Sequence, residues 1–299
     1  MRIVVLLGLS GGLLGLAVAW APPSAPAPAP RQLRVAAVQM RSKPDLEANL
    51  VRTAALLKEA AARKAQVAVF PECSASGYFN DYTPKLNAAQ LADAEKRLSD
   101  ACRDAGIWAI LGLPVRAGKK LYNSALVIDD TGRIRERYHK IQLAEPWPDP
   151  GDHLSVFRVH GVPCSIIICH DERYPELVRL PVLAGARVVF YLSHESPLTQ
   201  EHKVGPYRAQ IQARAVENSV FVVHANAPAN PDASGSHGQS RIIDPDGNLM
   251  QEASLFREEM LVETLELSRA TAANAQRSLT GGVLGAWWRE GLKHVRHID

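Results

Sequence analysis

Between residues 33 and 267 the sequence alternates short β-rich runs with longer segments of helical periodicity, which is typical of an α/β fold. Most of the short runs are apolar at every position, as in strands that are covered on both faces. The candidate strands are LRVAAVQM, AQVAVF, WAILGLPV, YNSALVID, CSIIIC, ARVVFYL, SVFVVHAN and SRIIDP. We expect one α/β domain in which crossover helices and hairpins connect these strands.

The segments between these runs contain the predicted helices and tight turns. The first helix is expected over residues 44–64, with Ser42 as its N-cap and Pro44 in its first turn. Further helices are expected over residues 87–105, 176–184 and 204–218. DDTG at residues 129–132 and PDGN at residues 245–248 have the composition of turns between strands.

The N-terminal residues 1–30 differ in composition from the alternating region. An apolar run over residues 3–19 ends in Ala17 and Ala19, which fit the small-x-small pattern of a signal-peptide cleavage site. The following APPSAPAPAP is an extended Pro/Ala spacer with no core of its own. We therefore expect export to the periplasm or out of the cell, with cleavage near Ala19. A retained membrane anchor is the alternative, because the run approaches membrane-spanning length.

Mass spectrometry of the protein from its native host tests the expected export. A mature N-terminus between Trp20 and Arg31 would support cleavage, whereas intact protein that begins at Met1 in the cytoplasmic fraction would contradict it. Export would also place the cysteines in an oxidising compartment, where thiols often pair.

The four cysteines carry different expectations. Cys164 and Cys169 belong to one predicted strand and are five residues apart, so their side chains point to opposite faces and cannot pair. Cys102 and Cys164 are interpreted as small buried hydrophobic residues. A disulfide between Cys73 and Cys102 is a further option.

The residues after Leu267 depart from the alternating pattern. They contain a Gly-Gly break and the adjacent Trp287 and Trp288, and we expect a C-terminal arm that packs on the domain or on a partner subunit. The chain is thus divided into a leader with spacer (1–30), a domain (31–267) and an arm (268–299). Its 34 Lys and Arg and 31 Asp and Glu give a net charge of +3 that is spread along the chain, so nothing indicates a nucleic-acid partner.

Three of the predicted strands end in residues that are suited to acyl transfer. AQVAVF runs into Glu72, RIRERYH delivers Lys140, and three isoleucines run into Cys169. In α/β sheets, active-site groups gather at the carboxyl ends of strands. A thiolate is the reactive form of cysteine, a buried glutamate can take its proton, and a lysine can hold the charge on a carbonyl oxygen.

A cysteine paired with a histidine is the rival arrangement. His170 follows Cys169 directly and would point to the other face of a strand. His139, His194 and His224 also lie near predicted strand ends, but no spacing favours one of them. The ten histidines form no i,i+4 or His-x-His set, so the sequence does not predict a metal site.

The motifs RVAAVQM, VAVFPECSASGY, YHKIQL, IIICHDERYPELVR and RAVENSVFVVHANA, followed by GSHGQSRIIDPDGN, resemble the nitrilase superfamily of carbon–nitrogen hydrolases in order. The resemblance covers nearly all of residues 33–267. It implies that Glu72 is a general base, that Lys140 stabilises an oxyanion and that Cys169 is the nucleophile. It also implies a second glutamate, for which Glu145 is the candidate, six residues before the Gly151 of a matching PG turn.

The resemblance extends to the residues around the nucleophile. His170 stands where an aromatic residue is most common and is expected to line the substrate pocket. Tyr78 and His194 are further candidate substrate-binding residues. The charged residues that follow the nucleophile match structural charges of the family, and we expect a salt-bridge network among Asp171, Arg173, Glu176 and Arg179.

The implied fold is a four-layer αββα sandwich with two mixed sheets face to face, and the implied assembly is a homodimer or higher homo-oligomer. The implied reaction is attack of Cys169 on an amide carbon, loss of ammonia or amine, and hydrolysis of the thioester, with no cofactor or metal. A small amide or N-carbamoyl compound is the favoured substrate. A nitrile is less favoured, because Cys169-His170-Asp171 replaces the usual Cys-Trp-Glu.

Two other classes of function are compatible with this sequence pattern. One is an N-acyltransferase with the same triad; such proteins carry several membrane-spanning helices, whereas the only long apolar segment here is the leader. The other is a catalytically silent binding protein, which the joint presence of Glu72, Lys140 and Cys169 argues against. Labelling with a thiol-reactive probe distinguishes an enzyme from a binding protein.

Overall fold

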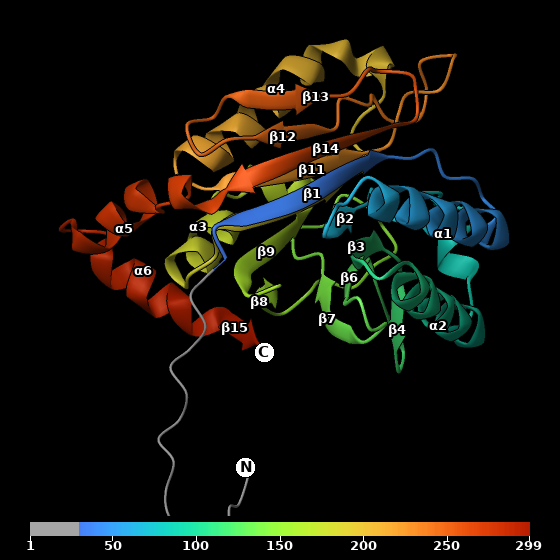
Figure 1. Cartoon of the computed structure of the whole chain (residues 1–299), viewed down its shortest axis with the longest axis horizontal. Helices are drawn as coiled ribbons and strands as arrows, with labels where there is room; N and C mark the ends of the chain where they lie inside the picture. Colours follow the sequence, from blue (N-terminus) through green and yellow to red (C-terminus); the bar gives the residue numbers. More distant parts are fainter. Residues whose placement is uncertain (1–29) are drawn as a thin grey trace, which may run out of the picture.

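The computed structural model of the chain describes residues 30–299, and the predicted signal peptide lies outside the described residues. Two sheets lie face to face (Figure 1). The first sheet has the strand order β14 (Glu259–Glu266), β1 (Gln32–Gln39), β2 (Val67–Val69), β3 (Trp108–Gly112), β6 (Ser124–Ile128) and β7 (Ile134–His139). It is mixed, because β1, β2 and β3 are parallel while β14, β6 and β7 pair antiparallel to their neighbours.

The second sheet is mixed as well. Its strand order is β13 (Leu249–Glu252), β12 (Arg241–Ile243), β11 (Phe221–Asn226), β10 (Val188–Ser193), β9 (Val162–Ile168), β8 (Leu154–Val159) and β15 (Val295–Ile298). The central strands β9, β10 and β11 are parallel, so their carboxyl ends meet at one edge.

Helices cover the outer face of each sheet. The first sheet is covered by α1 (Leu46–Ala62) and α2 (Ala88–Ala105), and the second by α3 (Glu176–Leu183) and α4 (Val204–Val216). This arrangement is the four-layer αββα sandwich, and the expected fold class is confirmed.

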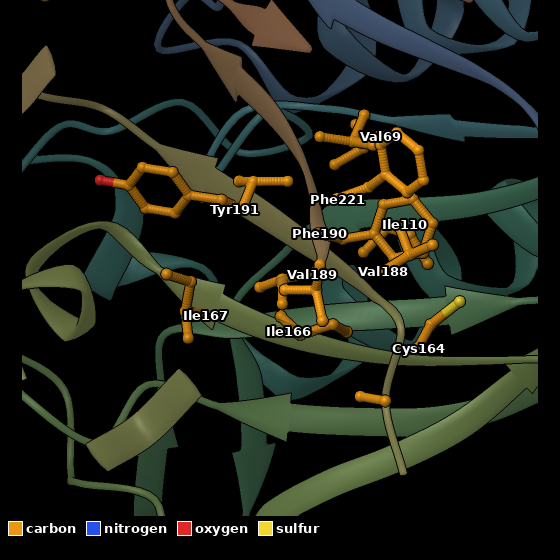
Figure 2. Close-up of a cluster of buried hydrophobic side chains, with 14 of the residues drawn as sticks. Val69, Ile110, Cys164, Ile166, Ile167, Val188, Val189, Phe190, Tyr191 and Phe221 are labelled. Carbon is orange, nitrogen blue, oxygen red and sulfur yellow. The ribbon is translucent and has the colours of Figure 1, made fainter. Parts of the chain in front are cut away.

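The alternation of side chains along β1 explains why its sequence is apolar at every position. Val35 and Ala37 belong to the core between the sheets, whereas Ala36 and Val38 belong to the core under α1 and α2. Figure 2 shows part of the inter-sheet core, in which Val69 and Ile110 of the first sheet lie near Phe190 and Phe221 of the second.

The interpretation of Cys102 and Cys164 as small buried hydrophobic residues is confirmed. Cys164 and Cys102 are both 0% exposed, one in the core between the sheets and the other under α2. Cys73, Cys102, Cys164 and Cys169 are all free thiols, so the possible Cys73–Cys102 disulfide is not formed.

The expected start of the first helix is wrong. Asp45 is the N-cap of α1, because its side chain accepts a hydrogen bond from the Ala48 N–H at 3.1 Å. Ser42 instead donates its hydroxyl to the Ser74 carbonyl oxygen at 2.8 Å, and Pro44 lies before the helix. The Ser42 side chain is therefore used to hold the loop that follows Glu72.

Several strands were not predicted from the sequence. The largest is β14, which pairs with β1 along its whole length. Its sequence EMLVETLE mixes apolar and acidic residues, because it is the edge strand of the first sheet and is only partly buried. The others are β8, β13 and β15 of the second sheet, and β4 (Val115–Ala117) with β5 (Lys120–Tyr122), which form a separate two-stranded ribbon.

The residues after Leu267 pack on their own chain. They form α5 (Ala273–Thr280), α6 (Gly285–Gly291) and β15, which pairs parallel to β8 and extends the second sheet. Trp288 packs against the core, whereas Trp287 is 53% exposed. Within residues 30–299, no helix combines the length and the hydropathy that a membrane span requires.

Candidate active site

Cys169 lies on a sharp turn at the carboxyl end of β9. Its φ of 43° is in the left-handed region, and the chain continues as a 3-10 turn over Cys169–Arg173 before α3 begins. The isoleucines before it are buried in the core, but Cys169 itself is partly exposed. A strained strand-to-helix turn is a common way to hold a nucleophile at the end of a sheet, and this turn explains why the apolar strand changes to polar residues in one step.

Asp171 holds this turn through hydrogen bonds, so the expected salt-bridge network is wrong. Its buried carboxylate accepts the Ile168 N–H at 3.0 Å, the Tyr138 hydroxyl at 3.0 Å and the Gln142 N–H at 2.8 Å. None of the ion pairs within residues 30–299 involves Asp171, Arg173, Glu176 or Arg179. Asp171 is fully buried, and neighbouring backbone N–H groups and a tyrosine hydroxyl, not arginines, satisfy its carboxylate. The carboxylate thus ties the end of β9 to the loop that follows Lys140.

Glu72, Lys140 and Glu145 form a buried cluster around one ammonium group. The Lys140 Nζ donates to Glu72 Oε1 at 2.8 Å and to Glu145 Oε1 at 2.7 Å. Asn123 Nδ2 donates to the same two oxygens at 2.7 Å each. All four side chains are at most 6% exposed. The structure therefore brings together the three charged residues that the sequence motifs singled out.

Local structure explains how these residues converge. Asn123 and Lys140 flank the paired ends of β6 and β7, and the Lys140 N–H donates to the Asn123 carbonyl oxygen at 2.8 Å. The loop that carries Glu145 returns to Lys140 at Gly151, whose N–H donates to the Lys140 carbonyl oxygen at 2.8 Å. A Cβ atom at Gly151 would lie 2.2 Å from the His139 carbonyl oxygen, so only glycine permits this close return.

Glu72 and Cys169 contact opposite ends of one residue. Glu72 Oε2 accepts the His194 N–H at 3.0 Å, and the Cys169 Sγ lies 3.8 Å from the His194 carbonyl oxygen. His194 follows β10, so the carboxyl ends of β2, β9 and β10 meet at this point. The carboxylate and the thiol are consequently neighbours, as the sequence analysis predicted.

The environment separates the pKa values of the two glutamates. Burial, reinforced by the Glu145 carboxylate, raises the pKa of Glu72 to about 8 in spite of the Lys140 ammonium. Burial also opposes ionisation of Glu145, but the Lys140 ammonium prevails and lowers the pKa of Glu145 to about 2. Glu145 is therefore ionised at neutral pH, whereas Glu72 can take up and release a proton near it.

The thiol and the ammonium complete this electrostatic pattern. Burial, and then the Glu72 carboxylate, raise the pKa of Cys169 well above its usual value, so the thiol needs a base to lose its proton. Burial disfavours the charge on Lys140, but the nearby carboxylates raise its pKa well above the usual range. Two of the three Nζ hydrogens bind Glu72 and Glu145, and the third has no acceptor among the described residues. This N–H can hold a developing oxyanion.

A cavity of about 240 Å³ opens beside Cys169. Tyr78, His170 and His194, the three candidate substrate-binding residues, all line it, and Tyr78 stacks on His194 at a ring distance of 4.6 Å. A larger hollow of about 350 Å³ lies over α1 and α2, but its lining contains no thiol or carboxylate. The cavity at Cys169 is the one that can bring a small substrate to the thiol.

The histidines do not provide an alternative base for Cys169. Burial lowers the pKa of His194 to about 4 and also lowers that of His170, so both imidazoles are weaker bases than an exposed histidine and carry no charge at neutral pH. His139 stacks on Tyr122 and contacts the Ser124 hydroxyl. His224 is buried against the Ser193 hydroxyl, at 2.6 Å. The contacts of the His139, His194 and His224 rings are thus with groups other than the Cys169 sulfur.

The structure adds residues that the sequence analysis missed. Asn123 donates to both Glu72 and Glu145. In the sequence, the one indication of this role was a lone amide side chain at the start of an otherwise apolar predicted strand. Glu172 and Glu195 line the cavity although both are buried. Glu195 follows β10, so a strand-end carboxylate was its signal; Glu172 lies in the turn after Cys169, where no sequence pattern distinguishes it.

Comparisons with known proteins agree with this geometry. The model of the carbon–nitrogen hydrolase family matches residues 34–275. An omega-amidase from Xenopus tropicalis is 30% identical over 238 residues, which are 74% of this chain and 84% of that protein. A 2-oxoglutaramate amidase from Bacillus subtilis (strain 168) is 30% identical over 241 residues, which are 77% of this chain and 88% of that protein.

A solved structure with a similar fold is an amidase from Nesterenkonia sp. AN1. In the form compared, a glutamate-to-glutamine variant shows covalent addition of the acetamide moiety of fluoroacetamide at the active site cysteine. Its TM-score is 0.74 at 26% identity, and the match covers 84% of this chain and 96% of that chain.

Proposed function

The chain belongs to the carbon–nitrogen hydrolase family and is an enzyme that acts on amides, and we propose that it hydrolyses small amides through a thioester on Cys169. The observation that carries this proposal is the convergence of three groups beside one cavity. Cys169 faces the cavity from its strained turn, and Lys140 lies between Glu72 and Glu145 at the adjoining strand ends.

In the acylation half of the reaction, the Glu72 carboxylate takes the proton of the Cys169 thiol. The sulfur attacks the amide carbon, and the carbonyl oxygen becomes an oxyanion that the third Nζ hydrogen of Lys140 holds. The protonated Glu72 then gives its proton to the amide nitrogen. The carbon–nitrogen bond breaks, ammonia leaves, and a thioester remains on Cys169.

In the deacylation half, water replaces ammonia in the cavity. Glu72 takes a proton from this water as its oxygen attacks the thioester carbon, and the resulting oxyanion is again held by Lys140. When the carbon–sulfur bond breaks, the proton returns to the sulfur and the carboxylic acid leaves. Glu145 stays ionised throughout and keeps the buried Lys140 charged and in place, a positioning role.

The lining of the cavity bears on the class of amide. The Bacillus subtilis relative is named for 2-oxoglutaramate, an amide whose other end is a carboxylate. In this chain the buried carboxyl groups of Glu172 and Glu195 line the cavity, and they make it a poor site for the carboxylate of such a substrate. An amide or N-carbamoyl compound without a free carboxylate suits this lining better.

A substrate panel read by ammonia release tests the proposed function. Small alkyl amides and N-carbamoyl compounds are expected to release ammonia with saturable kinetics, and the corresponding nitriles are expected to do so much more slowly. Preincubation with iodoacetamide, which alkylates thiols, should stop the reaction. Turnover of nitriles alone, or full activity of the alkylated protein, would contradict the proposal.

A further inference from the structure

Two carboxylic acid side chains line the cavity beside Cys169 and take no part in the proposed hydrolysis. Glu172 lies in the turn that follows Cys169 and is 1% exposed, and Glu195 lies just after β10 and is 3% exposed. Carboxyl groups are almost never this buried unless they have partners. The partners of the two acids differ.

Glu195 is neutralised within the protein. Its Oε1 accepts the Tyr191 hydroxyl at 3.0 Å, and its Oε2 lies 2.7 Å from His237 Nε2. Burial opposes both charges, yet the contact lowers the pKa of Glu195 to about 2 and raises that of His237. Figure 2 shows the Tyr191 hydroxyl directed away from the core cluster. Glu195 is therefore one half of a closed ion pair.

Glu172 has no ion-pair partner of this kind, although its carboxyl group also contacts the Tyr191 hydroxyl. Its Oε2 makes no hydrogen bond to any residue that the structure describes, and its carboxyl group is in no ion pair within residues 30–299. The Arg214 guanidinium binds the backbone oxygen of Glu172 at 2.8 Å and pairs with Glu217 at 2.9 Å. Arg173 donates to the Tyr207 hydroxyl at 3.1 Å and lies over its ring. The guanidinium groups of Arg173 and Arg214 therefore bind acceptors other than the Glu172 carboxyl group.

Apart from the Lys140 ammonium, which acts at its catalytic end, the cavity supplies no positive charge. None of its lining residues is lysine or arginine, and its two imidazoles, His170 and His194, are neutral at neutral pH because burial lowers the pKa of each. A buried carboxyl group that lines such a cavity is complementary to a hydrogen-bond donor with positive charge. The same lining disfavours a carboxylate, which would enter without a partner.

We infer that Glu172 determines specificity by selecting amides whose acyl chain carries a protonated amine, which its carboxylate binds in a charge-assisted hydrogen bond. This inference rests on the proposed amide hydrolysis and names the substrate class of the same site. Burial, and then the Glu195 carboxylate, raise the pKa of Glu172 well above its usual value. The empty cavity thus avoids an unpaired buried charge, and an arriving ammonium group supplies the partner that the carboxylate form needs.

Turnover of three amides of equal length tests this selection. The full-length chain is assayed with a short ω-amino amide, the corresponding alkyl amide and the corresponding ω-carboxy amide. We expect kcat/KM for the ω-amino amide to exceed that for the ω-carboxy amide by roughly 100-fold. Glu172→Gln should remove this preference, mainly by raising KM for the ω-amino amide relative to KM for the alkyl amide.

The glutamine variant also distinguishes two ways in which Glu172 can bind. Glutamine has the shape of a protonated glutamic acid, so retention of the preference in Glu172→Gln would overturn the inference. Glu176→Gln is the matched control, because Glu176 lies nearby in α3 and outside the cavity lining, and the side-chain replacement is the same. Its substrate preference should equal that of the unmodified protein.

Binding without turnover separates this inference from the proposed hydrolysis. Calorimetry with a short alkylammonium ion should show binding to the unmodified protein and to Glu176→Gln, and a loss of roughly 100-fold in affinity for Glu172→Gln. An alkylcarboxylate of the same length that binds as tightly as the ammonium ion would overturn the inference. If alkylammonium binds as expected but no amide releases ammonia, the proposed function fails and the role of Glu172 in binding stands.

Discussion

Replacement of Cys169 by alanine is expected to abolish ammonia release, with kcat/KM reduced by roughly 10⁵-fold, because no other thiol reaches the cavity among the described residues. The fold should survive the change. Alanine keeps the Cβ atom, so the strain of the left-handed backbone at φ 43° is the same in both proteins. Ammonia release is measured with a saturating alkyl amide, and folding is followed by circular dichroism and thermal unfolding.

Cys164→Ala is the matched control for this experiment. Cys164 belongs to the same strand as the isoleucines before Cys169, but it is 0% exposed and packs in the inter-sheet core (Figure 2). Its replacement removes one buried sulfur and should lower the free energy of unfolding by about 1 kcal/mol while activity is retained. Normal ammonia release from Cys169→Ala would reject the proposed mechanism.

Replacement of Glu72 by glutamine is expected to lower kcat/KM by roughly 10³-fold, because no group then takes the proton of the Cys169 thiol. An amide oxygen can still accept from Lys140 and Asn123, but the amide nitrogen would face the His194 N–H that Glu72 Oε2 now accepts. Some loss of stability should therefore accompany the loss of activity. Rapid-quench measurement of the first turnover should show that formation of the thioester, and not its hydrolysis, has become the slow step.

The pH dependence of the unmodified protein tests the same role of Glu72. Because only the carboxylate can accept a proton and the pKa of Glu72 is raised to about 8, kcat/KM should fall about tenfold per pH unit below that value and level off above it. This fall of kcat/KM at lower pH should be absent in Glu72→Gln. Glu136→Gln is a suitable control, because Glu136 is a buried carboxylate of β7 that contacts Ser155 and His153. A rate for Glu72→Gln equal to that of Glu136→Gln would show that Glu72 is not the base.

The fold was predictable to the extent that it depends on buried strands. Runs such as the isoleucines before Cys169 are apolar at every position because two cores cover them, and this pattern is visible in the sequence. Edge strands such as β14 and β15 were missed, because solvent on one side removes that signal. The cap of α1 was misplaced for a local reason, since Ser42 and Asp45 are both good caps and only a contact with Ser74 separates them.

The site was predictable where a functional residue follows a strand. Glu72, Lys140 and Cys169 all do so, and the parallel strands bring such residues to one edge. Asn123 lies 51 residues from Glu72 in the sequence, and no local sequence pattern indicates that the two side chains form a hydrogen bond. The role of Asp171 was misjudged for a related reason, because its partners are backbone N–H groups, which leave no trace in side-chain composition.

The mass of the enzyme during turnover directly tests whether a thioester forms on Cys169. Unmodified protein and Glu72→Gln are mixed with an excess of an alkyl amide, quenched in acid within one turnover, and digested for mass spectrometry. In the unmodified protein, we expect the peptide that contains Cys169 to gain the mass of the acyl group with loss of one hydrogen. This adduct should be nearly absent from Glu72→Gln. Rapid ammonia release without acyl mass on Cys169, or with the acyl group on another residue, would contradict the account.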